Sequence, residues 1–194
     1  STYGLEHFDE SMAAQHELTR RFTCEFSIRP FLETAPERTL GVLRTWSKDP
    51  NAHVRRLVSE GTRPRLPWGA RIRWIEREPD RVLHLLEALK DDPSSAVRRS
   101  VANHLNDVAK AHPDWVCTVA ERWLEGASHE RKALVNHGLR TLVKAGDLRA
   151  LGLLGFGKKP KISIVRASFE PKRVPIGTTT RANFTLTSTT PSKQ

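Results

Sequence analysis

The sequence lacks any run of eighteen consecutive apolar residues, which argues against a transmembrane helix, because a helix needs roughly 20 such residues to cross a bilayer. It holds only two cysteines, Cys24 and Cys117, and they do not form a CxxC motif. Isolated thiols are typical of a reducing cytoplasm, so we expect both to be buried and unpaired. The eight histidines show no metal-ligand spacing such as HExxH, so the sequence predicts no metal site.

The excess of positive charge is concentrated at the C-terminal end of the sequence. The formal net charge is +10, but residues 156–194 contain eight Lys and Arg residues and one acidic residue. Residues 1–155 contain 24 basic and 21 acidic residues and are almost balanced. This part would bind a polyanion such as DNA only if its basic groups gather on one face, so total charge alone does not establish nucleic-acid binding.

One stretch of the sequence occurs twice. The segment VRRLVSEGTRPRLPW begins at Val54, and the related segment VRRSVANHLNDVAK begins at Val97, 43 positions later. An Asp-Pro turn precedes each copy, at Asp49 and at Asp92. A period near 40 residues that opens with a turn and continues with a helical apolar pattern is typical of paired-helix repeats. We therefore predict an all-α, HEAT-like helical-repeat solenoid.

Apolar spacing predicts the individual helices. Leu18, Phe22 and Phe26 recur every four residues and are followed by Pro30, which predicts a helix over 12–29. In the two repeated helices, the valines and leucines at helical spacing are expected to face the core. The predicted helices after the first span 36–48, 52–61, 68–76, 80–90, 94–111, 113–124, 129–145 and 147–154.

The pattern changes after Gly155. Two stretches with alternating polarity, 161–169 and 182–187, predict β-strands, and the proline- and glycine-containing segment between them predicts a turn. Two strands do not form a stable domain alone. We therefore interpret this end of the sequence as the incomplete start of a β-sandwich.

Basic residues recur on the polar side of the predicted helices. A solenoid sets equivalent helices about 10 Å apart, a spacing that suits a phosphate backbone. The polar stripes contain Arg21, Glu25 and Arg29, then Arg56, Glu60 and Arg63, then Arg99, Asn103 and Asp107, and finally Lys132, Asn136 and Arg140. The residues predicted to contact DNA are Arg56, Arg63, Arg65, Arg99, Asn103 and Lys132. The alternative is a solvated face with weak ion pairs, each contributing about 0.3–0.5 kcal/mol.

The segment GTRPRLPW, which ends at Trp68, differs from the other copy of the repeat. Its two prolines, two arginines and tryptophan predict a stiff loop with hydrogen-bond donors and one large aromatic face. Two interpretations remain open. Either the loop is a helix break with Trp68 filling the core, or it presents Trp68 to a ligand. The acids within the basic stripes would repel phosphate, so they need another role if DNA binds there.

Several of these segments carry a family resemblance. SEGTRPRLPW, VRRSVANHLNDVAK and HGLRTLVKAG, with RRFTCEFSIRPFL before them, resemble the AlkC branch of the AlkC/AlkD DNA glycosylases. The resemblance covers roughly residues 1–155, and residues 161–190 are similar to the start of the immunoglobulin-like domain of some AlkC members. It implies a HEAT-like glycosylase domain over 1–155, a linker over 156–160 and an incomplete immunoglobulin-like β domain over 161–194.

The resemblance also implies an activity. It predicts a base excision repair enzyme that hydrolyses the N-glycosidic bond of 3-methyladenine and 3-methylcytosine in duplex DNA without flipping the base. By resemblance, Asp107, Glu60, Glu25 and Trp68 fall on the active-site positions. The implied partner is double-stranded DNA with alkylated bases, and we expect a monomer, away from membranes, in the bacterial cytoplasm at the nucleoid.

The residue types suit this chemistry. An N3-alkylated base is cationic, so its glycosidic bond is already weak, and breaking it leaves a sugar with oxocarbenium character. Carboxylates stabilise such a charge and can orient or deprotonate a water. A Trp face attracts a cation by about 0.5–2 kcal/mol. We assign water activation and transition-state stabilisation to Asp107, and stabilisation of the cationic lesion or sugar to Glu60 and Glu25.

Two other function classes remain to be weighed against the glycosylase. A non-catalytic HEAT-repeat scaffold that binds DNA or protein would share the fold, but it would not need acids inside a basic stripe. A base-flipping glycosylase or a nuclease is disfavoured, because the sequence has neither the glycine pattern of a helix-hairpin-helix motif nor carboxylates clustered for two metals.

Overall fold

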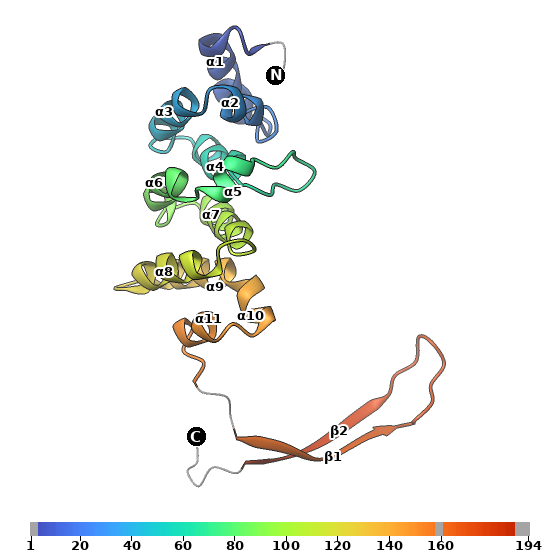
Figure 1. Cartoon of the computed structure of the whole chain (residues 1–194). Coiled ribbons are helices and arrows are strands. Elements are labelled where there is room, and N and C mark those ends of the chain that lie inside the picture. The colour runs from blue at the N-terminus through green and yellow to red at the C-terminus, as the bar shows by residue number, and fades with distance from the viewer. Residues whose placement is uncertain (1–3, 158–160, 189–194) are drawn as a thin grey trace. The chain divides into compact units, whose positions relative to one another are not determined.

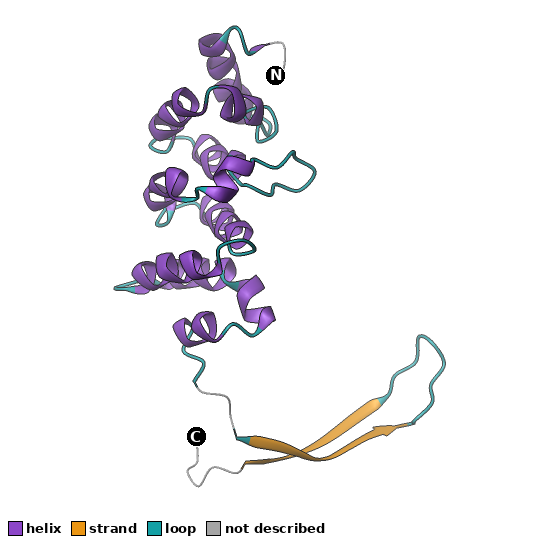
Figure 2. Ribbon diagram, in the orientation of Figure 1, coloured by secondary structure: helices purple, strands orange, loops and turns teal. Residues whose placement is uncertain are grey.

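The computed structural model describes residues 4–157 and 161–188. The chain divides into two units, Ser1–Leu154 and Gly155–Gln194. Figure 2 shows helices in the first unit and strands in the second. Residues 158–160 of the predicted linker and residues 189–194 of the predicted β domain lie outside the described residues. None of the helices described is both long and apolar enough to cross a membrane.

The first unit is a stack of short helices (Figure 1). Its helices are α1 Phe8–Thr19, α2 Arg29–Thr34, α3 Pro36–Trp46, α4 Ala52–Gly61, α5 Arg73–Arg77, α6 Asp80–Leu89, α7 Ser95–Val108, α8 Pro113–Leu124, α9 His129–Gly138, α10 Arg140–Ala145 and α11 Leu148–Leu153. Three consecutive pairs, α3 with α4, α6 with α7, and α8 with α9, pack against each other. Helices α1, α4, α7 and α9 form one row of neighbours, and α3 contacts α6 on the other side.

The core lies between these rows, as the apolar spacing predicted. Val54, Leu57 and Val58 of α4 are buried, and so are Val97, Val101, Leu105 and Val108 of α7. Burying each such side chain contributes about 1.5–3 kcal/mol. Cys24 and Cys117 are also buried and unpaired, as expected. The packing therefore fixes which sides of α4 and α7 remain for polar residues.

The sequence repeat is a structural repeat at its turns. The Asp49 carboxylate accepts the backbone N–H of Asn51 at 2.7 Å, and the Asp92 carboxylate accepts that of Ser94 at 2.8 Å. The arginine six positions after each aspartate, Arg55 or Arg98, donates to the backbone carbonyl of that aspartate. The two copies thus use the same side-chain bonds to begin α4 and α7, which sets the two helices in equivalent positions.

The predicted helix over 12–29 is wrong. Helix α1 ends at Thr19, a turn segment follows, and Pro30 opens α2 instead of ending a helix, because its fixed φ suits the first helical turn. The buried residues of α1 are Phe8, Met12, Gln15 and Thr19. Leu18, Phe22 and Phe26 are exposed. Their four-residue spacing therefore did not mark a buried helix face.

Two other helices differ from the prediction. The predicted helix over 68–76 is reduced to α5, because residues before Arg73 form a loop in which the Ile72 N–H donates to the Pro64 carbonyl. The predicted helix over 129–145 is interrupted at Leu139, which separates α9 from α10. Gly138 lies at this break, and a Cβ there would come within 3.3 Å of the Leu105 side chain, so glycine allows α9 close to α7.

The second unit contains one antiparallel hairpin of β1 Ile162–Glu170 and β2 Arg181–Ser188. Ile164 pairs with Leu186 and Ala167 with Phe184, and the register shifts between Ile164 and Arg166. The rings of Phe169 and Phe184 meet edge to face at 6.0 Å. Both strands were predicted within one residue of their observed ends. The apolar side chains of the hairpin are exposed within the described residues.

Candidate active site

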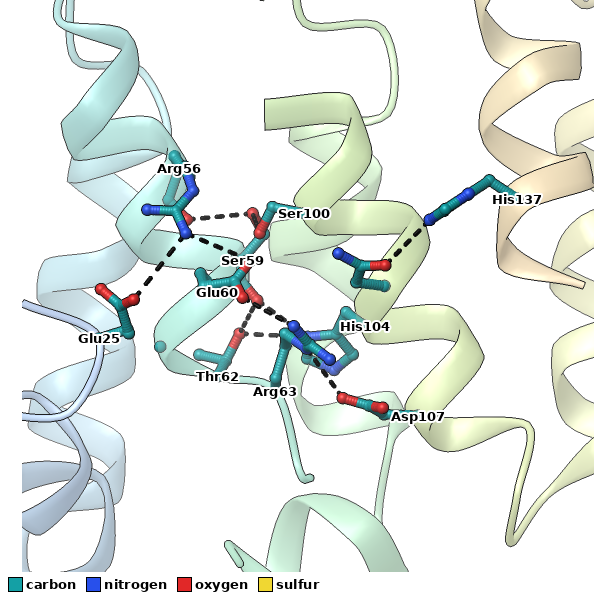
Figure 3. Close-up of polar contacts among 12 residues, drawn as sticks. Glu25, Arg56, Ser59, Glu60, Thr62, Arg63, Ser100, His104, Asp107 and His137 are labelled. Carbon is teal, nitrogen blue, oxygen red and sulfur yellow. Dashed lines mark hydrogen bonds and ion pairs between the residues drawn. The ribbon is translucent and has the colours of Figure 1, made fainter. Parts of the chain in front are cut away.

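Three acids and three basic residues form a chain of alternating charge across the row of helices, and Figure 3 shows Glu25, Arg56, Glu60, Arg63 and Asp107 of this chain. Glu25 lies in the turn before α2, Arg56 and Glu60 on α4, Arg63 just after α4, Asp107 at the end of α7 and Lys110 just after α7. The Arg56 guanidinium lies 3.9 Å from the carboxylates of both Glu25 and Glu60. Arg63 bonds Glu60 at 2.7 Å and Asp107 at 2.8 Å. Lys110 lies 3.3 Å from the other Asp107 oxygen. The structure thus brings together three of the four residues predicted to be catalytic.

The Arg63 side chain is the centre of this cluster. Arg63 and Glu60 are each 7% exposed, and Asp107 is 2% exposed. Burial acts to lower the pKa of Arg63, but the hydrogen bond and charge of Asp107 and the charge of Glu60 outweigh it and raise that pKa. Arg63 is therefore a buried cation between two predicted catalytic acids. Asp107 and Glu60 already occupy donors of the Arg63 guanidinium. The contact of Arg63 with phosphate stays a prediction.

Sequence reasoning missed the residue that holds the Arg63 loop. Arg29 was placed on the polar stripe of the first predicted helix, but it is 4% exposed. Its guanidinium donates to the carbonyls of Gly61 at 3.0 Å, Arg63 at 2.8 Å and Ala70. Three carbonyls bound by one guanidinium fix both ends of the loop. No local pattern identifies this role, because the partners lie more than 30 positions away in the sequence.

His104 lies beneath the cluster on α7 and was also missed. Its Nδ1 lies 3.2 Å from the Ser59 carbonyl and 3.4 Å from Thr62 Oγ1, whose own proton is donated to the Val58 carbonyl. Nδ1 must therefore carry the proton and donate to both oxygens. Ser59 also donates to Ser100 of α7 at 2.8 Å. These bonds fix the end of α4 against α7, and with it the positions of Glu60 and Arg63.

A pH dependence of stability follows from His104. Burial lowers the pKa of this imidazole from 6.5 to about 4. As pH falls below 6.5 the unfolded chain binds a proton that the folded chain does not, so stability is lost, by up to about 3 kcal/mol near pH 4. Urea unfolding at about pH 7 and pH 5 should show this loss. His104→Asn keeps a donor for Ser59 and should show less of it, whereas an unchanged pH dependence in this variant would contradict the assignment.

Trp68 lies on the loop and not in the core. It is 99% exposed and has a φ of 61°, a left-handed conformation that is unfavourable for a side chain of this size. The interpretation in which Trp68 fills the core is therefore wrong. Trp68 lines a hollow of about 680 Å³ together with Phe26, Arg71, Arg73 and other residues. No contact joins its ring to the acids, so the structure does not bring Trp68 into the acid cluster.

The predicted DNA-contact residues are in different situations. Arg65 is paired with Glu76, and the Asn103 side chain accepts hydrogen bonds from His137 and Arg140. Arg99 and Lys132 are exposed on the adjacent helices α7 and α9, with no hydrogen bond or ion pair among the described residues. Arg99 and Lys132 are thus the predicted contacts whose charges are available to a ligand. Among the described residues, no group of three His, Cys, Asp or Glu side chains is placed to hold a metal ion.

Comparisons with known proteins place the chain among DNA repair proteins. The family model described as DNA alkylation repair enzyme matches residues 22–135. The Bacillus subtilis (strain 168) protein named Uncharacterized protein YhaZ is 42% identical over 182 residues, which are 94% of this chain and 51% of that protein. A solved structure of Pseudomonas fluorescens alkylpurine DNA glycosylase AlkC bound to DNA containing an abasic site analog is similar with a TM-score of 0.91 and 43% identity. That similarity covers 98% of this chain and 53% of that chain, so the chain spans about half the length of both relatives.

Proposed function

Because the chain belongs to the DNA alkylation repair enzyme family, we propose that it forms the helical part of an alkylpurine DNA glycosylase. Its substrates are cationic alkylated bases in duplex DNA, chiefly 3-methyladenine and 3-methylcytosine, which it removes without base flipping. The first unit is a HEAT-like solenoid and carries the chemistry. The second unit belongs to an immunoglobulin-like domain that helps to hold DNA. The AlkC structure supports the DNA partner, because that protein is bound to DNA with an abasic site analog.

The observation that carries this proposal is the gathering of Glu25, Glu60 and Asp107 from three separate segments. Carboxylates stabilise a sugar that develops positive charge, and the effect is larger where the acids are shielded from water. The acids lie 12% or less exposed at their side chains. Asp107 orients or deprotonates the attacking water and stabilises the positively charged transition state, and Glu60 and Glu25 also stabilise the positive charge. Neither step needs a metal or an organic cofactor.

The test is release of the damaged base. Methylated duplex DNA is incubated with the whole protein, and free 3-methyladenine and 3-methylcytosine are separated and quantified. Release of these bases, with little release of unmodified purines, is the expected result. Salt-sensitive binding of the same DNA without any release would sink the glycosylase.

One observation favours a second function. The three acids are matched by three cations, Arg56, Arg63 and Lys110, and such a balanced network also occurs where charges only support a fold. The alternative is therefore a non-catalytic HEAT-repeat scaffold that binds DNA or protein. It predicts binding without base release, and it predicts that neutralising Asp107 changes stability alone.

The exposure of Trp68 leads to a separate prediction. Trp68→Ala should reduce the rate of base release about tenfold, because a Trp face contributes up to about 2 kcal/mol to binding a cation. The free energy of unfolding should change by less than about 0.5 kcal/mol, since the Trp68 side chain is almost fully exposed. Single-turnover release and urea unfolding measure the two effects. Trp74→Ala is a matched control, because this half-buried Trp donates to the Leu32 carbonyl and its loss should lower stability. Equal release by Trp68→Ala and the parent protein would exclude the role.

A further inference from the structure

A group of polar side chains outside the acid cluster lies where α7, α9 and α10 meet. The Asn103 Oδ1 atom lies 3.0 Å from His137 Nε2 and accepts a hydrogen bond from Arg140 Nη2 at 3.1 Å. Figure 3 shows His137 reaching toward α7. Arg140 also donates to the His137 carbonyl at 2.7 Å. These bonds hold three side chains from three elements in one arrangement.

The arrangement determines which atoms face outward. An amide oxygen only accepts, so His137 Nε2 must carry a proton, and Nδ1 of the neutral ring is the nitrogen without one. The Asn103 oxygen has His137 and Arg140 as its partners, and the Asn103 NH2 group donates no hydrogen bond among the described residues. Protonation of His137 Nδ1 would add a second donor and a positive charge. Once Nδ1 is protonated, the group offers donors and no acceptor.

The space beside this group is basic. A hollow of about 410 Å³ between α7 and α9 is lined by Arg98, Arg99, His129 and His137, with Glu130 as its one acidic lining residue. Arg98 already donates to the carbonyls of Asp92 and Pro93, whereas Arg99 is exposed and has no bonding partner among the described residues. The free charge at the hollow is thus that of Arg99, close to His137.

We propose that Arg99, Asn103 and His137 bind one phosphate of the DNA backbone, and that binding there takes up a proton on His137. The inference rests on the proposed function, because it takes DNA as the ligand. Arg99 supplies a permanent charge, Asn103 an amide donor, and His137 a donor and a charge that exist only after protonation. DNA affinity thereby becomes dependent on pH in the range where histidine titrates.

The sign of the effect follows from the neighbours of His137. Burial, with the charges of Arg140 and Arg99, lowers the pKa of His137 in the free protein. A phosphate beside the ring offsets these positive charges and raises that pKa. Since the bound state then holds a proton that the free state lacks, affinity must increase as pH falls. Glu130 and His129 of α9 and Arg98 of α7 also line the hollow, and none of them is bonded to the His137 ring.

The experiment measures DNA affinity against salt at two pH values. The whole protein is titrated onto a short fluorescein-labelled duplex at about pH 6 and about pH 8, and log Kd is plotted against log salt. Each phosphate contact contributes about 0.9 to the slope. We expect the slope to be about 0.9 steeper at the lower pH. His137→Gln keeps an N–H donor for Asn103 but cannot take up the proton. In this variant the slope at both pH values should equal the slope of the parent protein at about pH 8.

Two variants act as controls. His7→Gln removes an exposed histidine at the start of α1 and should keep the full pH difference. Arg99→Ala should lower the slope at both pH values. A pH difference that persists unchanged in a folded His137→Gln, or that is absent from the parent protein, overturns the proposal.

Base release separates this from the proposed function. If the protein releases damaged bases but its salt slope does not depend on pH, only the proposed phosphate site is wrong. If the salt slope depends on pH but no base is released, only the proposed glycosylase activity is wrong. Absence of DNA binding overturns both.

Discussion

Replacing Asp107 with asparagine is expected to slow base release by about a hundredfold to a thousandfold, the range found when one electrostatic stabiliser is removed from an active site. Asparagine has nearly the same shape, and its amide oxygen can still accept the hydrogen bond that Arg63 donates at 2.8 Å. The negative charge that stabilises the sugar is lost. DNA affinity should stay equal or increase, because a charge that repels phosphate is removed.

Single-turnover release from methylated duplex DNA, together with a binding titration, measures both effects. Glu60→Gln should change them in the same direction. Asp114→Asn is a suitable control, since this exposed aspartate at the start of α8 lies outside the cluster and its loss should leave release unchanged. A folded Asp107→Asn that releases base at the parent rate would remove Asp107 from the chemistry. In that case the network of acids and bases would be a structural one.

The features that were predictable from the sequence are those set by local rules. The Asp-Pro turns and the apolar positions of α4 and α7 follow from helix period and turn chemistry, which act within a few residues. The bounds of α4 and α8 were predicted without error. The gathering of the acids could be predicted from the sequence, because the 43-residue repeat sets α4 beside α7. Repetition therefore carried information about distant contacts that a single helix pattern does not contain.

The errors came from contacts between distant segments. Arg29 and Arg63 both have the sequence appearance of surface residues, yet Arg29 is directed to the carbonyls of Gly61 and Ala70. Arg63 follows the end of α4, and its side chain lies between α4 and α7 instead of continuing the polar stripe. The exposure of Trp68 depends on the left-handed backbone of a loop that Arg29 holds. None of these orientations follows from spacing, because each depends on where another element lies.

Removing the charge of Arg63 is expected to have the largest effect on stability. In Arg63→Met the carboxylates of Glu60 and Asp107 stay buried without the cation that now bonds both at 2.7 and 2.8 Å. Breaking a buried pair in this way costs about 3–5 kcal/mol, because an uncompensated charge remains away from water. Such a loss is a large share of the ordinary 5–15 kcal/mol of a folded domain. Urea unfolding at neutral pH measures it.

A triple variant separates the charge of Arg63 from its packing. Adding Glu60→Gln and Asp107→Asn to Arg63→Met removes the two buried charges that have lost Arg63 and keep only Arg56 and Lys110 nearby, so much of the lost stability should return even though the side chain of Arg63 is still absent. Arg99→Met is the control, because exposed Arg99 has no ion pair among the described residues and its loss should cost less than about 0.5 kcal/mol. If Arg63→Met alone costs no more than this control, the acids are hydrated and do not depend on Arg63. If the triple variant regains stability, the fold tolerates neutral residues at these positions, and the three charges are retained for a purpose other than stability.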